Sequence, residues 1–392
     1  MKISKRFANV GDSSTLIITA KAKQMKSRNI DVAILAAGEP DFDTPQPIKD
    51  GAIAAIQEGF TGYTAVRGIN DLLELICEKF KTDNGISYKP ENVVVSTGAK
   101  QAIYNIIQAL CDEDSEVILL APYWVSYIEM VKMTGAVPVI VDTSLDNFRI
   151  NPERIEKAIT NKTRMIIINS PNNPTGVVYN ENELKSIADI VVKHNIYCIS
   201  DEIYEKIIYS PAKHISIASL NDEIRKLTLT VNGFSKTYAM TGWRIGYFAG
   251  EKDLVNKALM VQTHSTSCTS AISQKAAVAA LKADKMIIDK MINSFKSRRD
   301  YAMERLEKSH LDFIHPEGAF YVFINLSKIL GKNEQVNNSA DICMKLLDEF
   351  NVAVIPGDGF GAEGYIRISY AASLEEIKKG LDRIEEFVKK YS

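Results

Sequence analysis

Apolar runs rich in valine and isoleucine alternate with amphipathic stretches through the middle of the chain. Residues 165–168, Met-Ile-Ile-Ile, contain no polar position, which is typical of a strand buried on both faces. Similar runs predict strands at 93–95, 117–120, 137–141, 196–200, 227–231 and 245–249, with helices at about 101–110, 125–133 and 181–194. This alternation predicts a mostly parallel sheet that is covered by helices.

The pattern changes after about residue 290. A long charged helix near 291–309 is followed by expected strands at 320–324, 352–355 and 365–369 and by a terminal helix at 374–389. A chain of 392 residues exceeds one typical domain. We therefore expect an α/β protein in three parts: an N-terminal segment (1–45) that packs with the small domain, a large domain (46–290) and a small α+β domain (291–392).

Composition narrows the class of protein. Hydrophobic residues make up 46% of the chain and charged residues 24%, as in soluble globular proteins, and a net charge of −2 gives no reason to expect nucleic acid or an acidic membrane as partner. There is no run of 18 apolar residues and no signal-peptide core near Met1. The five cysteines show no C-x-x-C pair or metal spacing, so we expect reduced thiols, no metal site and a cytoplasmic protein.

The stretch 231–246 carries the first candidate chemistry. Lys236 leaves an expected strand through a turn of small residues, and Arg244 follows eight residues later. A lysine amine whose pKa is lowered by burial or by a nearby cation can form a Schiff base with a carbonyl cofactor, and an arginine can clamp a phosphate bidentately. Most lysines, however, are solvated surface charges, so this stretch does not decide the function alone.

Three other expected strands also end in polar or small residues. The turn at 96–101 opens a helix and leaves backbone N–H groups for an anion, the loop 169–176 is rich in turn formers, and Asp201 follows a buried strand. Taken singly, each has a bland explanation: a plain turn, or a structural ion pair for Asp201. Open α/β sheets bind ligands beyond the carboxyl ends of their strands, so together the four ends predict one site.

These segments resemble the fold-type-I aminotransferases that use pyridoxal 5′-phosphate (PLP), and among them the class I aspartate aminotransferase group. The resemblance extends from Ile30 to the C-terminal helix and is carried by residues 38–45, 121–127, 170–176, 200–204 and 241–247. It implies a large domain with a mostly parallel seven-stranded sheet covered by helices and a smaller α+β domain. It also implies a homodimer, in which Tyr63 reaches the cofactor phosphate of the partner subunit.

The resemblance implies roles for single residues. Lys236 is similar to the catalytic Schiff-base lysine, Asp201 to the aspartate that pairs with the pyridine nitrogen, and Trp124 to the aromatic residue that stacks on the ring. Tyr204 and Asn173 match the donors to the ring hydroxyl oxygen. The expected cofactor-binding residues are Tyr63, Gly98, Ala99, Lys100, Trp124, Asn173, Asp201, Tyr204, Ser235, Lys236 and Arg244.

The expected substrates follow from the same resemblance. Arg367 matches the clamp for the α-carboxylate, with Gly38 beside it, and Lys100 matches the lysine that contacts a side-chain carboxylate. The full expected substrate-binding set is Ser13, Thr15, Gly38, Lys100, Trp124, Asn173 and Arg367. The resemblance thus implies ping-pong transfer of the amino group of aspartate or glutamate to 2-oxoglutarate or oxaloacetate.

Several alternatives stay open. Relatives that also use prephenate tend to carry a basic residue before the Ser-x-Thr motif, whereas this chain has Gly11 and Asp12 there. An aromatic or alanine aminotransferase, or a PLP-dependent lyase, could keep the same cofactor residues. A regulator built on this fold would need an attached DNA-binding domain, for which 392 residues leave no room.

Overall fold

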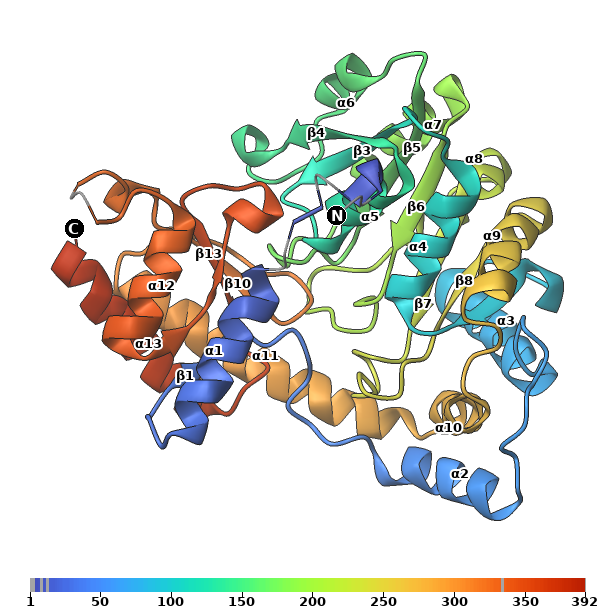
Figure 1. The fold of residues 1–392 in the computed structure, drawn as a ribbon, viewed down its shortest axis with the longest axis horizontal. Helices are drawn as coiled ribbons and strands as arrows, with labels where there is room; N and C mark the ends of the chain where they lie inside the picture. The colour runs from blue at the N-terminus through green and yellow to red at the C-terminus, as the bar shows by residue number, and fades with distance from the viewer. Residues whose placement is uncertain (1–3, 8–9, 12–13, 333–334, 392) are drawn as a thin grey trace.

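The computed structural model describes residues 4–7, 10–11, 14–332 and 335–391. Figure 1 shows two groups of elements: a large sheet with its covering helices, and a smaller group formed by the last quarter of the chain together with helix α1 (Ser14–Ser27). The predicted α/β architecture, with one large and one small sheet, is confirmed.

The large sheet contains seven strands within the described residues, in the order β2-β8-β7-β6-β5-β3-β4. All seven predicted strands are present, and their bounds are β2 (Val93–Ser96), β3 (Glu116–Ala121), β4 (Val137–Asp142), β5 (Thr163–Asn169), β6 (Tyr197–Asp201), β7 (Thr228–Gly233) and β8 (Gly246–Ala249). Strand β8 runs antiparallel to both of its neighbours, β2 and β7, whereas the other pairs are parallel. The sheet is therefore mostly parallel, as predicted.

Side chains that alternate along the inner strands are buried against helices on opposite faces, whereas most side chains of the edge strand β4 are partly or fully exposed. Val117 and Leu119 pack with the apolar faces of α4 and α5, whereas Ile118 and Leu120 belong to the cluster that includes α7. Burial on both faces explains why these strands are almost continuously apolar. The helices of this part are α2 (Gln46–Gln57), α3 (Asn70–Asn84), α4 (Ala99–Leu110), α5 (Ser126–Thr134), α6 (Pro152–Ala158), α7 (Glu181–His194), α8 (Asp222–Leu227), α9 (Lys252–Ser265) and α10 (Ala271–Lys282).

The small sheet has the order β12-β13-β10-β9 within the described residues. Its strands are β9 (Phe313–Ile314), β10 (Tyr321–Asn325), β12 (Ile355–Pro356) and β13 (Tyr365–Ser369), and it is accompanied by α11 (Lys285–Lys308), α12 (Ser339–Phe350) and α13 (Leu374–Tyr391). The single strand expected at 352–355 is divided in two, because β11 (Val352–Ala353) pairs with β1 (Ala33–Ile34) and β12 pairs with β13. The first strand of the chain is thus bonded to its last third.

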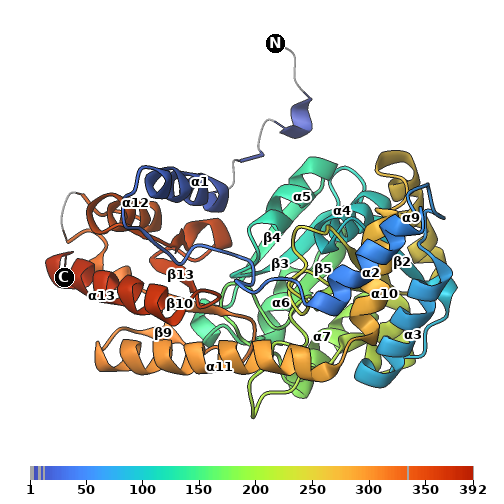
Figure 2. The same ribbon diagram turned by 90° about the horizontal axis from the view of Figure 1, so that it is seen from below.

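Helix α11 connects the two sheets. Figure 2 shows it running along the molecule from the large sheet to the small one. It begins at Lys285, earlier than the helix expected near 291–309, and so crosses residue 290. We propose the division into 1–45, 46–290 and 291–392 as the domain description, with α11 shared across the second boundary.

No helix among the described residues is both long enough and apolar enough to cross a membrane.

Candidate active site

Four strand ends meet at one edge of the large sheet. Strands β5, β6 and β7 are parallel neighbours, with Asn169 paired with Asp201 and Asp201 with Val231. The Asn169 amide strengthens this edge, because it donates to the Asp201 carbonyl at 2.9 Å and accepts from the Asn173 N–H at 2.8 Å. The loop that follows each strand therefore places its polar residues at this common edge.

Lys236 lies just beyond β7. Its amine donates to the Gly38 carbonyl at 2.5 Å and stands 6.0 Å from the centre of the Tyr204 ring. The pKa of Lys236 is lowered to about 8, mainly by burial; Arg367 and Arg244 contribute in the same direction, whereas carboxylates nearby act in the opposite direction. A lysine in this state supplies a neutral amine near neutral pH, which is what a nucleophile or a base requires.

Asp201 ends β6 and is only 4% exposed. Burial raises the pKa of Asp201 to about 6, although the Tyr127 hydroxyl, which donates to its carboxylate at 2.6 Å, works in the other direction. No role for Tyr127 was predicted, even though it lies three residues after Trp124 in the stretch 121–127. The position of Tyr127 on the first turn of α5 was the only signal that could have pointed to this contact.

A cationic cradle lies at the N-terminus of α4. Gly98 has φ of +82°, no side chain caps the helix, and a Cβ at this position would lie 2.8 Å from Nη2 of Arg244. Gly246 allows the same approach from β8, because a Cβ there would lie 2.6 Å from the Ala99 nitrogen. Free N–H groups, the helix dipole and a guanidinium at one point favour an anion. Ser235, buried at 8% exposure, lies on the adjoining turn after β7. A cleft of about 660 Å³, lined in part by Arg244, opens beside it.

Arg367 lies on β13 and reaches the large domain. Its Nη1 donates to the Asn173 side chain at 3.0 Å and its Nη2 to the Ala36 carbonyl at 3.0 Å. The Nε atom is buried without a hydrogen-bond partner among the described residues. Burial lowers the pKa of Arg367, and the Tyr321 ring lies 4.4 Å from its guanidinium carbon. This buried cation therefore has a donor available for an acidic ligand.

Tyr321 is a second contact that the sequence did not reveal. Its hydroxyl forms a 2.8 Å hydrogen bond with the Tyr204 hydroxyl, although the two residues lie 117 positions apart. Tyr321 begins β10 of the small sheet and is fully buried. It links Tyr204 of the large domain to Arg367, and no local pattern could have indicated this pairing.

A second cation lies near Trp124. The Lys100 amine stands 4.8 Å from the centre of the Trp124 ring, and Trp124 packs edge-on against Tyr127 with ring centres 5.3 Å apart. Burial lowers the pKa of Lys100, and the charge of Arg244 lowers it further. Lys100 therefore belongs to the same positively charged surroundings as the cradle.

One predicted residue, Tyr63, lies away from this cluster, and two others cannot be placed from the described residues. Tyr63 is 96% exposed, on a segment between α2 and α3. Ser13 lies outside the described residues, and Thr15 belongs to α1 but its side chain lies outside them as well.

The chain belongs to the class I and II aminotransferases, because a sequence model of that family, "Aminotransferase class I and II", matches residues 30–384. It is 44% identical over 394 residues to the aspartate aminotransferase of Bacillus subtilis (strain 168), with 100% of both chains covered. It is also 44% identical to a probable aspartate/prephenate aminotransferase of Rickettsia conorii, over 98% of each chain. Among solved structures, an aspartate aminotransferase from Thermus thermophilus with maleate superimposes with a TM-score of 0.93 at 40% identity, covering 99% of this chain and 100% of the other. The predicted family, fold and enzyme class are confirmed.

Proposed function

We propose that this protein is a PLP-dependent aspartate aminotransferase that moves the amino group of aspartate or glutamate to 2-oxoglutarate or oxaloacetate by a ping-pong mechanism. The observation that carries the proposal is the pair formed by Lys236, which is partly buried, and Asp201, which is 4% exposed. The pKa of Lys236 is lowered and that of Asp201 is raised, so both move toward neutrality. Groups with such shifts in one site are typical of acid–base catalysis.

The residues at the edge of the sheet fit PLP. A side chain at position 98 would displace Arg244, so Gly98 keeps open a space where the first N–H groups of α4 and the guanidinium can receive a phosphate. Asp201 would hold the pyridine nitrogen, and Tyr204 with Asn173 the ring hydroxyl oxygen. Ala99 and Ser235 would complete the phosphate contacts, and Trp124 would pack on the ring. When bound, PLP supplies an aldehyde carbon for the amino group and a ring that takes up electrons from the Cα–H bond.

The protein's own groups then carry out three tasks. The Arg367 guanidinium fixes the α-carboxylate beside Gly38, which orients the Cα–H bond toward Lys236. The Lys236 amine accepts the Cα proton and later returns it. The Asp201 carboxylate stays ionised above about pH 6, where it stabilises a positive charge on the atom it faces. Over both half-reactions, one amino acid and one 2-oxo acid exchange their amino and oxo groups.

The preference for acidic substrates rests on two separate cations. Arg367 is buried on β13, whereas Lys100 lies exposed on α4, and the pKa of each is lowered. A substrate with two carboxylates can satisfy both. In the sequences and structures to which this chain is similar, the printed names include aspartate aminotransferase, and one structure contains maleate, which is a dicarboxylate.

A second activity, on prephenate, is supported by the names of several relatives. Gly11 replaces the basic residue expected for it, and its backbone N–H is instead bonded to Glu129 at 2.9 Å. The two activities can be distinguished by assaying a panel of substrates. The donors are aspartate, glutamate, phenylalanine and alanine, and the acceptors are 2-oxoglutarate, oxaloacetate and prephenate. Turnover of prephenate comparable to that of 2-oxoglutarate would establish the second activity.

We further propose a cytoplasmic homodimer. An almost fully exposed tyrosine is unusual in a monomer, and the position of Tyr63 matches the residue that the family extends across the subunit interface. Ile53 and Ile56 on α2 are also exposed, at 47% and 54%. Apolar side chains of this kind support a contact between subunits.

The direct test of the proposal is the Lys236→Ala variant. The purified wild type should be yellow with bound PLP, and the variant should retain PLP loosely and lose transamination by several orders of magnitude, because the covalent attachment and the proton carrier are both removed. The measurements are the absorbance spectrum and kcat with aspartate and 2-oxoglutarate. Lys226→Ala, an exposed lysine on α8, is the matched control. Near wild-type turnover in Lys236→Ala would contradict the proposal.

A further inference from the structure

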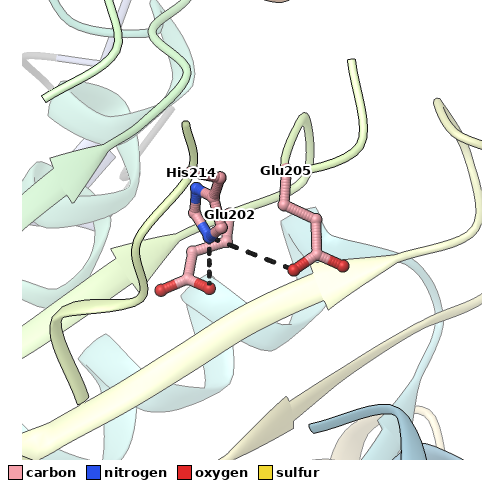
Figure 3. Close-up of side chains that lie close together, drawn as sticks. All are labelled: Glu202, Glu205 and His214. Atoms are coloured by element: carbon pink, nitrogen blue, oxygen red, sulfur yellow. Dashed lines mark hydrogen bonds and ion pairs between the residues drawn. The ribbon is translucent and has the colours of Figure 1, made fainter. Parts of the chain in front are cut away.

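A cluster of buried charged residues lies directly behind the turn that carries Asp201 and Tyr204. Figure 3 shows the side chains of Glu202, Glu205 and His214 gathered at one point. His214 Nε2 lies 3.1 Å from Glu202 and 4.0 Å from Glu205, and the exposed fractions of the three side chains are 10%, 1% and 5%, in that order. Charged groups are rarely buried so deeply without partners or a task.

The carboxylates of Glu202 and Glu205 both accept hydrogen bonds or ion pairs from protein groups. Glu202 accepts from the hydroxyl groups of Ser200 at 2.9 Å and Ser216 at 2.7 Å, as well as from His214. Because a carboxylate without a proton can only accept, His214 donates from Nε2.

Glu205 is held from a different element. It forms an ion pair with Lys79 of α3, and the Asn84 amide donates to it at 3.1 Å. Burial alone would raise the pKa of Glu205, but Lys79 and His214 bring it down to about 2. Among the described residues this cluster has the spacing of a metal site. Lys79, however, already supplies a positive charge there, so a metal ion would be repelled.

The order of residues along the turn connects this cluster to the active site. Two of the proposed cofactor contacts lie on this turn, and each is followed directly by a residue of the cluster: Asp201 by Glu202, and Tyr204 by Glu205. Two carboxylates three positions apart are thus fixed to β6, to the loop before residue 217 and to α3 at the same time. The backbone between them has little freedom, and the positions of Asp201 and Tyr204 depend on it.

We propose that Glu202 and Glu205, held by His214 and Lys79, are positioning residues that set the places of the Asp201 carboxylate and the Tyr204 hydroxyl. This inference rests on the proposed function, because those two groups are the expected contacts of PLP. The cluster touches neither PLP nor substrate. Its effect is exerted through the backbone of 201–205, so damage to it changes how well the site is arranged for the cofactor.

The test compares Glu202→Gln, His214→Leu and His214→Gln in the full-length protein. His214→Leu removes one hydrogen-bond donor to Glu202. Glu202→Gln replaces the accepting carboxylate with an amide, whose N–H₂ group then faces the donors that the carboxylate had accepted from. Each should weaken PLP binding about tenfold, as expected for the loss of one buried charge-assisted hydrogen bond. Glutamine can place an N–H where His214 Nε2 lies, so His214→Gln should recover most of the affinity. The measurements are the Kd for PLP, and kcat and KM for aspartate. We expect kcat to fall and KM to change little, because Arg367 is untouched.

The surface pair His194–Glu156 supplies the control. Its Nε2 to Oε1 distance is 2.7 Å, close to that of the cluster, but both side chains are partly exposed. His194→Leu should therefore leave PLP affinity unchanged.

Three results would overturn the inference. One is a lower unfolding midpoint in Glu202→Gln and His214→Leu with PLP affinity and kcat unchanged, which shows a purely structural role. Another is equal loss in His214→Leu and His214→Gln. The third is a stoichiometric divalent metal in the purified wild type. If His214→Leu does not fold, Glu202→Gln decides between these results. A wild type that binds no PLP would instead contradict the proposed function.

Discussion

At the scale of single residues, burial shifts the pKa values of the groups proposed to act in catalysis, and the same burial lowers the stability of the folded protein. Lys236 and Asp201 both have pKa values that burial displaces toward neutrality, downward for the amine and upward for the carboxyl. In each case the charged form is disfavoured relative to water, so the folded protein is less stable than it would be with neutral groups there. Arg367 behaves in the same way, with a lowered pKa and an Nε that lacks a partner. A bound ligand would supply the partner that each of these groups lacks in the free protein.

The sign of this cost gives a prediction for Asp201→Asn. The folded protein holds the Asp201 proton up to about pH 6, whereas the ordinary value is 3.8. The native state therefore binds more protons than the unfolded state between these values, and the stability contributed by this group falls as the pH rises through that window. Above pH 6, ligand-free Asp201→Asn should be more stable than ligand-free wild type by about 3 kcal/mol, and the two should converge below pH 4. Urea unfolding at several pH values measures this. A variant less stable than wild type at pH 8 would refute the argument.

A second prediction concerns the two cations. Arg367 offers a planar fork to the α-carboxylate of every amino acid, so Arg367→Lys should reduce kcat/KM for all donors. Lys100 offers one point charge to a side-chain carboxylate. Lys100→Ala should lower kcat/KM for aspartate about thirtyfold, or ~2 kcal/mol, and affect phenylalanine far less. The test is kcat/KM for both donors in wild type and variants. Equal losses for both donors would show that Lys100 serves the cofactor or the fold.

At the scale of elements, the cationic cradle at the N-terminus of α4 is formed by a strand, a turn and a helix. The turn between the strand and the helix requires a glycine. Strand β2 ends at Ser96, Gly98 takes a left-handed φ of +82°, and α4 begins at Ala99 without a side-chain cap. The unsatisfied N–H groups of the first helical turn then face a region that contains Arg244. Arg244 itself has a positive φ of 52°, which is uncommon for a side chain of this size.

Gly98→Ala tests this element. The added Cβ would meet Arg244 Nη2 at 2.8 Å, and the backbone, with φ of +82° and ψ of 164°, lies in a region that essentially only glycine adopts and would cost about 1–3 kcal/mol. The end of an arginine side chain can move away, so we expect the loss of stability to come mainly from the backbone, together with a loss of PLP affinity of about tenfold or more. Equilibrium titration with PLP and thermal unfolding measure the two effects. Gly59→Ala, which also has a positive φ (73°) but no neighbour within 4 Å, controls for backbone strain alone. Similar PLP affinity in both variants would contradict the prediction.

The sequence predicted elements better than contacts, and the reason is physical. Strands such as 165–168 are visible because burial on both faces removes every polar position. The direction of β8 and the division of 352–355 depend on pairing partners far along the chain, which a local pattern does not contain. The same holds for Tyr321, whose contact with Tyr204 joins two domains. The strand ends pointed to Lys236, Arg244 and Asp201 as candidates, the resemblance supplied their roles and the other site residues, and geometry alone added Tyr127, Tyr321 and the Ala36 carbonyl.

At the scale of the whole molecule, the site is assembled from both sheets and lacks one expected part. Arg367 comes from the small sheet, whereas Asn173 and Lys236 follow strands of the large one. The Ala36–Gly38 segment is hydrogen-bonded to both parts, because the Ala36 carbonyl accepts from Arg367 and the Gly38 carbonyl accepts from Lys236. Within the described part of this chain, Tyr63 does not contact these residues and stands almost fully in solvent. In the proposed homodimer, a second copy of the chain would bring its own Tyr63 to the cradle, and each site would then depend on two subunits.

The final prediction tests that dependence by mixing two inactive proteins. Tyr63→Ala leaves the Lys236 of its own chain intact, and Lys236→Ala leaves its Tyr63 intact, so a heterodimer of the two contains one complete site and one that lacks both residues. Unfolding and refolding an equal mixture should restore about a quarter of wild-type activity, since half of the dimers are mixed and each has one working site of two. Lys236→Ala mixed with Arg367→Ala is the matched control: both residues serve the site of the same chain, so no complete site can form. The readout is transamination of aspartate, with sedimentation to confirm the dimer. No restoration in the mixture of Tyr63→Ala and Lys236→Ala, or a fully active monomer, would show that each chain builds its site alone. Restoration in the control would show that the gain of activity does not depend on Tyr63.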